Sequence, residues 1–419
     1  MDSTKKMILT YTDGEKLCYY VDGQKYTYES NYIKKYRETA LNSAKNREWK
    51  KKSEQMIDDF YFEEDSGVYA EIHGVSLTEE ENKIAYTFTV NQTSGIYYKY
   101  LDDETKTEAH VILSNEVDFI SYCVNEDGEA VGSIRSGEYS ANIAVFDKNN
   151  GNYKTLTDGG SLDENPFLDK DGNILYDSYG VGRDAENQFV TYLPAEILKL
   201  NSRTMELETL VTDENFSFVK PMQDSDGNLY CIKKPGAERK RENVFLQILT
   251  IPIRIIEAIV GFISTFVTIF SGKPMVSDGG SVKGDNSAAK NGKKDRRKIF
   301  VNNQIINAEE ELKRNQKSEY GGFIPREWVL VKIEPKGDGE YEILQEIAQG
   351  VADYCIVEDE GKTKLVYTNG KYVFECFEEE KKWKRNKLFN ADCCLKISGI
   401  RKSFKENSPF AEDKFFSHF

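Results

Sequence analysis

The chain has 419 residues, enough for about two or three domains or for one large repeat domain. Its formal net charge of −15 at pH 7 argues against general nucleic-acid binding, which requires a basic surface. The seven cysteines form no CxxC pair and no long apolar segment opens the chain, so we expect a cytoplasmic protein rather than an exported one.

A short sequence motif recurs along most of the chain. A tight turn rich in Asp, Asn and Gly opens an apolar strand, and further strands follow. The clearest copy is Asp171–Tyr176, with the hairpin Ala195–Val211 after it. Asp-Gly and Asn-Gly pairs favour such turns because they adopt positive φ at little cost. The other copies open at Asp13-Gly14, Asn82-Lys83, Asp127-Gly128, Asp226-Gly227 and Glu360-Gly361.

About six copies are present, and where uninterrupted they are roughly 40 to 55 residues apart, a spacing expected for four-stranded propeller blades. This pattern resembles the six-bladed β-propellers of the TolB-like family. The resemblance implies an all-β fold, most simply six four-stranded blades, with helical insertions after the first hairpin and within the fourth blade copy. Seven blades remain an alternative, because the C-terminal region is poorly patterned.

The segments follow in chain order. Residues 1–30 form a first hairpin that lacks the strand preceding the turn in other copies. We expect residues 391–397 to supply that strand, because joining both termini in one blade removes exposed sheet edges. Residues 66–232 and 327–400 hold the remaining blades. The tail, 401–419, either packs on the propeller or serves for docking.

The first insertion, residues 31–60, is predicted to be a helix because apolar residues recur at helical spacing. It either lies solvated on the rim of the propeller or contacts an anionic partner. Its basic residues are Lys34, Lys35, Arg37, Lys45, Arg47, Lys50, Lys51 and Lys52.

The second insertion, residues 233–326, interrupts the fourth copy and contains an apolar helix, 244–270. Its polar and small residues recur every three or four positions, which gives one narrow polar stripe. Four placements are open: in the plane of a membrane, against a partner or second copy, on its own propeller, or across a membrane. Spanning would put the two parts of the propeller on opposite sides. The apolar contact residues are Ile248, Leu249, Ile255, Ile256, Ile259, Val260, Ile263, Phe266, Val267 and Phe270.

Basic residues flank this helix in an otherwise acidic protein. Such residues are attracted to anionic headgroups, each contributing about 1 kcal/mol near the surface. We therefore predict that the 233–298 region associates with an anionic membrane surface, on the inner face of the cell membrane, or with a partner. The flanking set comprises Lys233, Lys234, Arg239, Lys240, Arg241, Lys290, Lys293, Lys294, Arg296, Arg297 and Lys298.

No catalytic or metal-binding pattern is recognisable. HExxH and GxSxG are absent, and the three histidines have no ligand spacing. Asp169–Asn173 and Asp224–Asn228 resemble the start of a calcium loop. The twelfth position, which requires a bidentate carboxylate, is Gly180 in the first and Pro235 in the second. We therefore predict no metal, no cofactor and no catalytic residue.

Two functions follow from these patterns. In the first, the protein is a non-catalytic propeller scaffold that binds an unidentified protein or peptide and is peripherally attached through helix 244–270. In the second, it is an enzyme with its site at the axial opening and the insertion as a lid. The second requires convergent polar groups with perturbed pKa at the axis.

Overall fold

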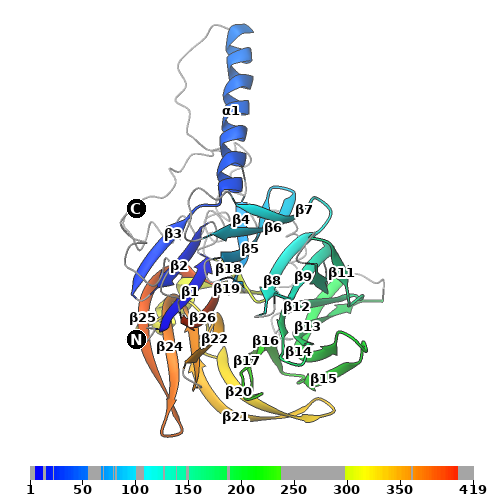
Figure 1. Cartoon of the computed structure of the whole chain (residues 1–419), viewed down its shortest axis with the longest axis vertical. Helices are drawn as coiled ribbons and strands as arrows, with labels where there is room; N and C mark the ends of the chain where they lie inside the picture. Colours follow the sequence, from blue (N-terminus) through cyan, green and yellow to red (C-terminus); the bar gives the residue numbers. More distant parts are fainter. Residues whose placement is uncertain are drawn as a thin grey trace.

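Six four-stranded antiparallel blades surround a common axis in the computed structural model (Figure 1). The innermost strands contact one another in a closed ring, in the order β26, β4, β8, β12, β16 and β22. The predicted six-bladed all-β propeller is therefore confirmed. The structure describes residues 5–12, 16–21, 23–54, 68, 70–78, 80, 83–100, 108–125, 128–137, 139–147, 151–185, 189–236, 298–359 and 362–403.

The first three blades come from the N-terminal part of the chain and from one C-terminal strand. From axis to rim, blade 1 contains β26 (Lys396–Ser403), β1 (Lys5–Thr12), β2 (Leu17–Val21) and β3 (Gln24–Tyr28). Blade 2 contains β4 (Ala70–Leu77), β5 (Lys83–Val90), β6 (Thr93–Tyr100) and β7 (Ala109–Ser114). Blade 3 contains β8 (Asp118–Val124), β9 (Ala130–Gly137), β10 (Ser140–Phe146) and β11 (Tyr153–Thr155).

The remaining blades follow in sequence order. Blade 4 contains β12 (Ser161–Leu168), β13 (Asn173–Arg183), β14 (Phe189–Asn201) and β15 (Leu207–Val211). Blade 5 contains β16 (Phe216–Gln223), β17 (Leu229–Pro235), β20 (Val329–Gly337) and β21 (Glu340–Gln349). Blade 6 contains β22 (Asp353–Asp359), β23 (Lys362–Thr368), β24 (Gly370–Glu379) and β25 (Lys382–Cys394).

In blades 4 and 5 the Asp-Gly turns join the first and second strands, as the repeat predicts. In blade 4, Gly172 has a φ of +81°, and the Asp169 carboxylate accepts hydrogen bonds from the backbone N–H groups of Asp171 (2.9 Å) and Asn173 (2.7 Å). In blade 5, Asp224 accepts the equivalent bond from Asn228 at 2.8 Å. The first aspartate of each calcium-like sequence therefore caps its own turn.

The closing strand of blade 1 lies further along the chain than expected. β26 pairs with β1 from Lys5↔Ser403 to Thr12↔Lys396. The first part of the expected range, 391–394, belongs instead to β25, the outer strand of blade 6. The first repeat copy, which opens at Asp13-Gly14, lies between β1 and β2. These are the second and third strands of blade 1, so this copy is one strand further from the axis than the others.

The first insertion contains α1 (Asn31–Glu54), which projects from the disc (Figure 1). Its base is fixed by Ser30, whose hydroxyl accepts the Ile33 N–H at 3.3 Å and the Tyr86 hydroxyl at 2.8 Å. Ile33 is buried against blades 1 and 2. Among the described residues, no helix is both long and apolar enough to cross a membrane.

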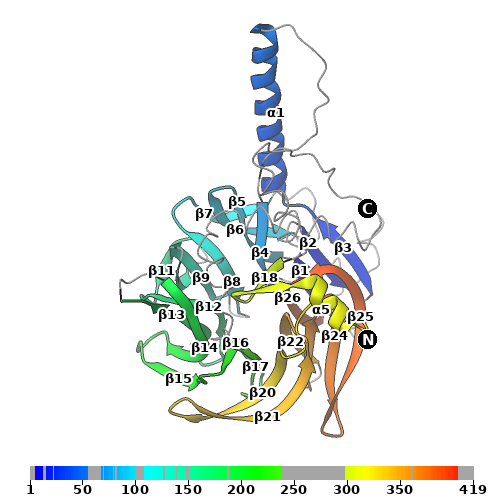
Figure 2. The ribbon, with the colours of Figure 1, turned by 180° about the vertical axis from the view of Figure 1, so that it is seen from behind.

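The second insertion lies between β17 and β20, the second and third strands of blade 5 in spatial order. Its described part, residues 298–328, contains β18 (Lys298–Val301), β19 (Gln304–Asn307) and α5 (Ala308–Asn315), and we call it the cap. Figure 2 shows β18 crossing one face of the disc towards its centre. Ile299, Val301, Phe323 and Trp328 bury the cap in the largest apolar cluster of the described chain.

Candidate functional site at the propeller axis

Charged side chains from several blades meet near the axis beneath the cap. Glu164 comes from β12, Asp177 from β13, Lys220 from β16, Lys234 from β17 and Asp353 from β22. We call these five residues the axial cluster. Asp353 begins β22 and Lys234 lies one residue before the end of β17, whereas Glu164 and Lys220 lie midway along their strands. We call the end of the propeller at which the insertion leaves β17 the insert face.

Matching bulges in two innermost strands shape the cluster. Asn165 and Lys220 both precede proline, have positive φ (49° and 54°) and coincide with register shifts against the next strand. Both residues then bond the same atom: the Asn165 side-chain amide (2.9 Å) and the Lys220 backbone N–H (2.8 Å) donate to Oδ1 of Asp177. Positive φ in non-glycine residues costs free energy and concentrates at functional sites.

Asp177 is a fully buried acid. Its exposed fraction is 0%, and its Oδ2 has no hydrogen-bond partner among the described residues. Burial, reinforced by the nearby Glu164 carboxylate, raises its pKa from 3.8 to about 7, although the two bonds to Oδ1 oppose the shift. This carboxyl group therefore exchanges its proton near neutral pH.

A chain of polar contacts extends from Asp177 to the closing strand. The Lys220 ammonium donates to Oδ1 of Asp353, which is 1% exposed. Oδ2 of Asp353 accepts the backbone N–H of Ile397 at 2.7 Å. The contacts thus link blades 4, 5, 6 and 1. A buried ion pair is costly to break because the remaining charge is left without compensation.

The cap closes this end of the axis with one tight turn. Asn302 and Asn303 adopt positive φ (46° and 58°), as a two-residue hairpin turn requires. The Asn302 carbonyl accepts the Tyr179 hydroxyl at 3.0 Å and the Lys234 amine, and its side-chain amide donates to the Ala352 carbonyl at 3.0 Å.

The turn also bonds a charged member of the cluster. The Asn303 amide donates to Oε2 of Glu164 at 2.8 Å, while Arg135 pairs with Oε1 at the same distance. Lys234 is 2% exposed, and burial lowers its pKa from 10.5 to about 7, although Asp177 and Glu164 oppose this shift.

The arrangement combines an acid and a base that both titrate near neutrality with a cap that covers them. Such perturbed groups are what an axial catalytic site requires. Desolvation of charged groups in a buried polar core also produces such pKa shifts. Among the described residues, no group of three or more His, Cys, Asp or Glu side chains is placed to hold a metal ion.

The predicted contact helix 244–270, with all ten of its apolar contact residues, lies outside the described residues. So do the basic flank residues Arg239, Lys240, Arg241, Lys290, Lys293, Lys294, Arg296 and Arg297. Lys298 begins β18. Lys234 was expected in the exposed flank, but the structure buries it at the axis because β17 continues to Pro235.

Sequence reasoning missed the axial cluster. Asp177, Lys220 and Asp353 lie in ordinary strand sequences, and only the blade geometry brings them together. The one local signal is the repeated dipeptide with proline, Asn165-Pro166 and Lys220-Pro221, at matching places in two innermost strands.

No protein-family model matches the chain, and no curated protein matches it. Solved structures with a similar fold include TolB from Acinetobacter baumannii, 10% identical over 96% of this chain and 67% of that chain, with a TM-score of 0.45. They also include a nidogen/laminin complex, 9% identical over 94% and 98%, with a TM-score of 0.46. The chain thus resembles TolB-like propellers, and the resemblance concerns the fold alone.

Proposed function

We propose that the protein is a non-catalytic binding propeller that associates with an anionic membrane surface through its insert face. The observation that carries this proposal is the position of the insertion's two ends. Where the insertion leaves β17, the Gly236 N–H donates to the Asn215 carbonyl at 2.8 Å. Where the described part of the insertion begins again, in the turn after β18, the Asn302 carbonyl accepts a hydrogen bond from the Lys234 amine. Gly236 and Lys298, the described residues on either side of the 237–297 segment, therefore lie at one face, which supports attachment from one side.

Exposed apolar side chains on the same face support this attachment. The β13–β14 hairpin connects the second and third strands of blade 4, at the same end as the β17–β20 insertion. It carries Val190 and Leu193, which are 45% and 47% exposed, and Phe300 in β18 is 41% exposed. Phe189 stacks on Tyr139 with ring centroids 4.3 Å apart. Aromatic and apolar side chains of this kind favour the membrane–water boundary.

The connection between β3 and β4 also lies at this end of the strands, and it contains α1. Lys34 and Lys35 on its first turns are exposed. Near an anionic surface each such lysine contributes about 1 kcal/mol. The insert face thus combines apolar contacts with basic residues, although the whole chain carries a net charge of −15.

Flotation with liposomes tests the attachment. We expect the intact protein to float with vesicles that contain phosphatidylglycerol, and a variant with residues 244–270 replaced by a Gly/Ser linker of equal length to stay in solution. Matching circular dichroism spectra of the two proteins control for folding. If neither protein floats and the replacement changes the oligomeric state, the insertion serves a protein interface and the membrane proposal fails.

A pair of point variants tests the orientation. Leu193→Glu is expected to weaken partitioning to anionic vesicles about tenfold, because a charge replaces an apolar contact of about 1.5–3 kcal/mol. Leu207→Glu is the matched control, since Leu207 is 58% exposed on the opposite face. It should partition like the wild type. Equal partitioning of the two variants would place the contact elsewhere, even if the wild type floats.

An enzyme with the cap as a lid is the second candidate. The buried Asp177 and Lys234, each with a pKa of about 7, favour it. The binding role is preferred because the Asn302-Asn303 turn fills the axial end. The turn is hydrogen-bonded to residues of blades 4 and 5 and to Ala352, which precedes β22.

A further inference from the structure

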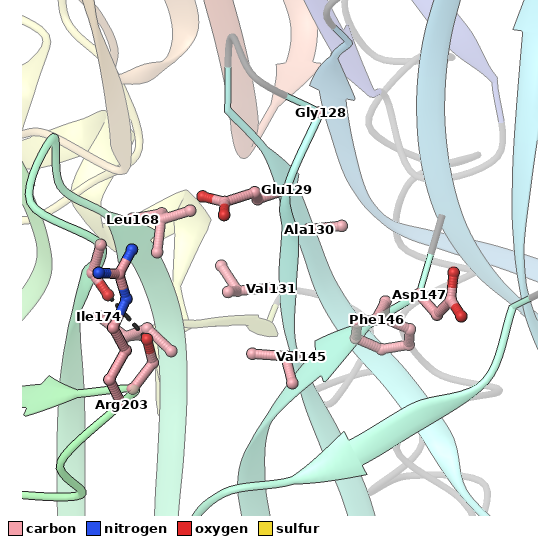
Figure 3. Close-up of a pocket in the computed structure, with 12 residues that line it drawn as sticks. Gly128, Glu129, Ala130, Val131, Val145, Phe146, Asp147, Leu168, Ile174 and Arg203 are labelled. Atoms are coloured by element: carbon pink, nitrogen blue, oxygen red, sulfur yellow. Dashed lines mark hydrogen bonds between the residues drawn. The ribbon is translucent and has the colours of Figure 1, made fainter. Parts of the chain in front are cut away.

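A second site lies on the face opposite the insertion, between blades 3 and 4. At the insert face these blades are joined by one parallel bridge, Ala141↔Leu162, which makes them a continuous sheet. Towards the other face they flank an open cavity of about 350 Å³ (Figure 3). This volume is at the small end of the range for small-molecule sites.

The floor of the cavity is apolar and the rim is charged. Val131 and Val145 line it from blade 3, and Leu168 and Ile174 line it from blade 4. In Figure 3, the Glu129 carboxylate points from blade 3 towards the side of the cavity where Arg203 lies. An apolar pocket with a few placed polar groups is the usual form of a ligand site.

Hydrogen bonds order part of the rim before any ligand binds. Glu129 and Asn125 exchange two bonds, Glu129 N–H to Oδ1 of Asn125 (2.8 Å) and Asn125 amide to Oε2 of Glu129 (3.0 Å). On the other side, the Arg203 N–H donates to Oδ1 of Asn201 at 3.0 Å, and the Ser202 hydroxyl donates to the Gly172 carbonyl at 2.9 Å. These bonds order the Glu129 side chain and the backbone at Arg203, which reduces the entropy lost on binding, whereas the Arg203 side chain is exposed.

Glu129 and Arg203 line one cavity, yet no ion pair joins them within 4.0 Å, and no described residue bonds the Arg203 guanidinium. A ligand with a cationic and an anionic group would satisfy both side chains at once, and its apolar part would cover the valine and leucine floor. We propose that this cavity binds a zwitterionic α-amino acid with an apolar side chain. Its ammonium group contacts Glu129 and its carboxylate contacts Arg203.

Calorimetric titration of the full chain with L-phenylalanine tests this site, with phenethylamine and 3-phenylpropionate as analogues that each lack one charge. We expect L-phenylalanine to bind more tightly than either analogue. Arg203→Gln should weaken L-phenylalanine and 3-phenylpropionate about tenfold or more and leave phenethylamine unchanged, because hydrogen bonds to charged groups are the stronger ones. Glu129→Gln should show the reverse selectivity.

Two further variants make the result decisive. Val145→Trp fills the cavity and should abolish binding of all three compounds, whereas Lys154→Gln removes an exposed charge on β11 outside the cavity and should have no effect. Absence of L-phenylalanine binding at millimolar concentration overturns the proposal. So does equal affinity for the three compounds, or unchanged affinity in the Arg203 and Glu129 variants. None of these outcomes bears on the membrane proposal, since the cavity lies on the opposite face.

Discussion

Truncation after Leu395, which removes β26, is expected to abolish cooperative folding of the propeller. The eight positions of β1 that pair with β26 would lose their partners, from Lys5 to Thr12. Ile8 and Leu9, both 0% exposed, lie on that strand. Asp353 would also lose its bond from Ile397 and remain a buried charge with less compensation. Without β26, β1 becomes an unpaired edge strand, which promotes aggregation.

Thermal unfolding followed by circular dichroism, together with size-exclusion chromatography, measures this effect. The matched control is truncation after Ser403, which keeps β26 and removes only residues 404–419. We expect that control to melt within a few degrees of the intact protein, because the described β26–β1 ladder is complete at Ser403. A sharp transition at the intact protein's temperature in the shorter variant would show that blade 1 holds without its inner strand.

The fold was predictable because its repeating element is local. A turn such as Asp169–Asn173 is specified by its own residues, and its carboxylate caps its own backbone. The end of β25 was not predictable, since no glycine or proline separates residues 382–394 from β26. The expected closing strand was therefore placed a few residues early, across the boundary between β25 and β26.

The axial cluster was beyond local reasoning for a different reason. The Lys220 N–H reaches Asp177 across 43 positions, and its ammonium reaches Asp353 across 133. These pairs exist only because successive blades turn the chain around one axis. The cap adds a contact between Glu164 and Asn303 that spans 139 positions. A single sequence contains no pattern at such separations, so only the proline dipeptides marked the place.

Asp177→Asn is expected to stabilise the protein at alkaline pH and to have a smaller effect in acid. The folded state raises the Asp177 pKa from 3.8 to about 7, so between these values the native protein binds one more proton than the unfolded chain. Stability therefore falls as the pH rises from about 4 to 7, and above 7 the folded state retains a buried ionised carboxylate. Ionisation of Asp177 in the folded state lowers the free energy of unfolding by roughly 4 kcal/mol in full.

Asparagine keeps the Oδ1 acceptor for the Lys220 N–H and the Asn165 amide, and it never ionises. Its amide adds an unsatisfied donor, which costs about 1–3 kcal/mol at every pH. The informative quantity is therefore the difference between two pH values. We expect the variant's change in unfolding free energy to be more favourable at pH 8 than at pH 5 by roughly 2–3 kcal/mol. Urea denaturation at the two pH values measures it.

Asp171→Asn is the matched control, because Asp171 is exposed in the blade 4 turn next to the same strand. It should change stability by less than about 0.5 kcal/mol at either pH, as surface substitutions usually do. If Asp177→Asn instead destabilises the protein equally at pH 5 and pH 8, the carboxylate is ionised throughout this range. The charges of Lys234 and Lys396 would then compensate it, and the cluster would be a permanent ion network that ties the cap to the blades rather than a proton-exchanging pair.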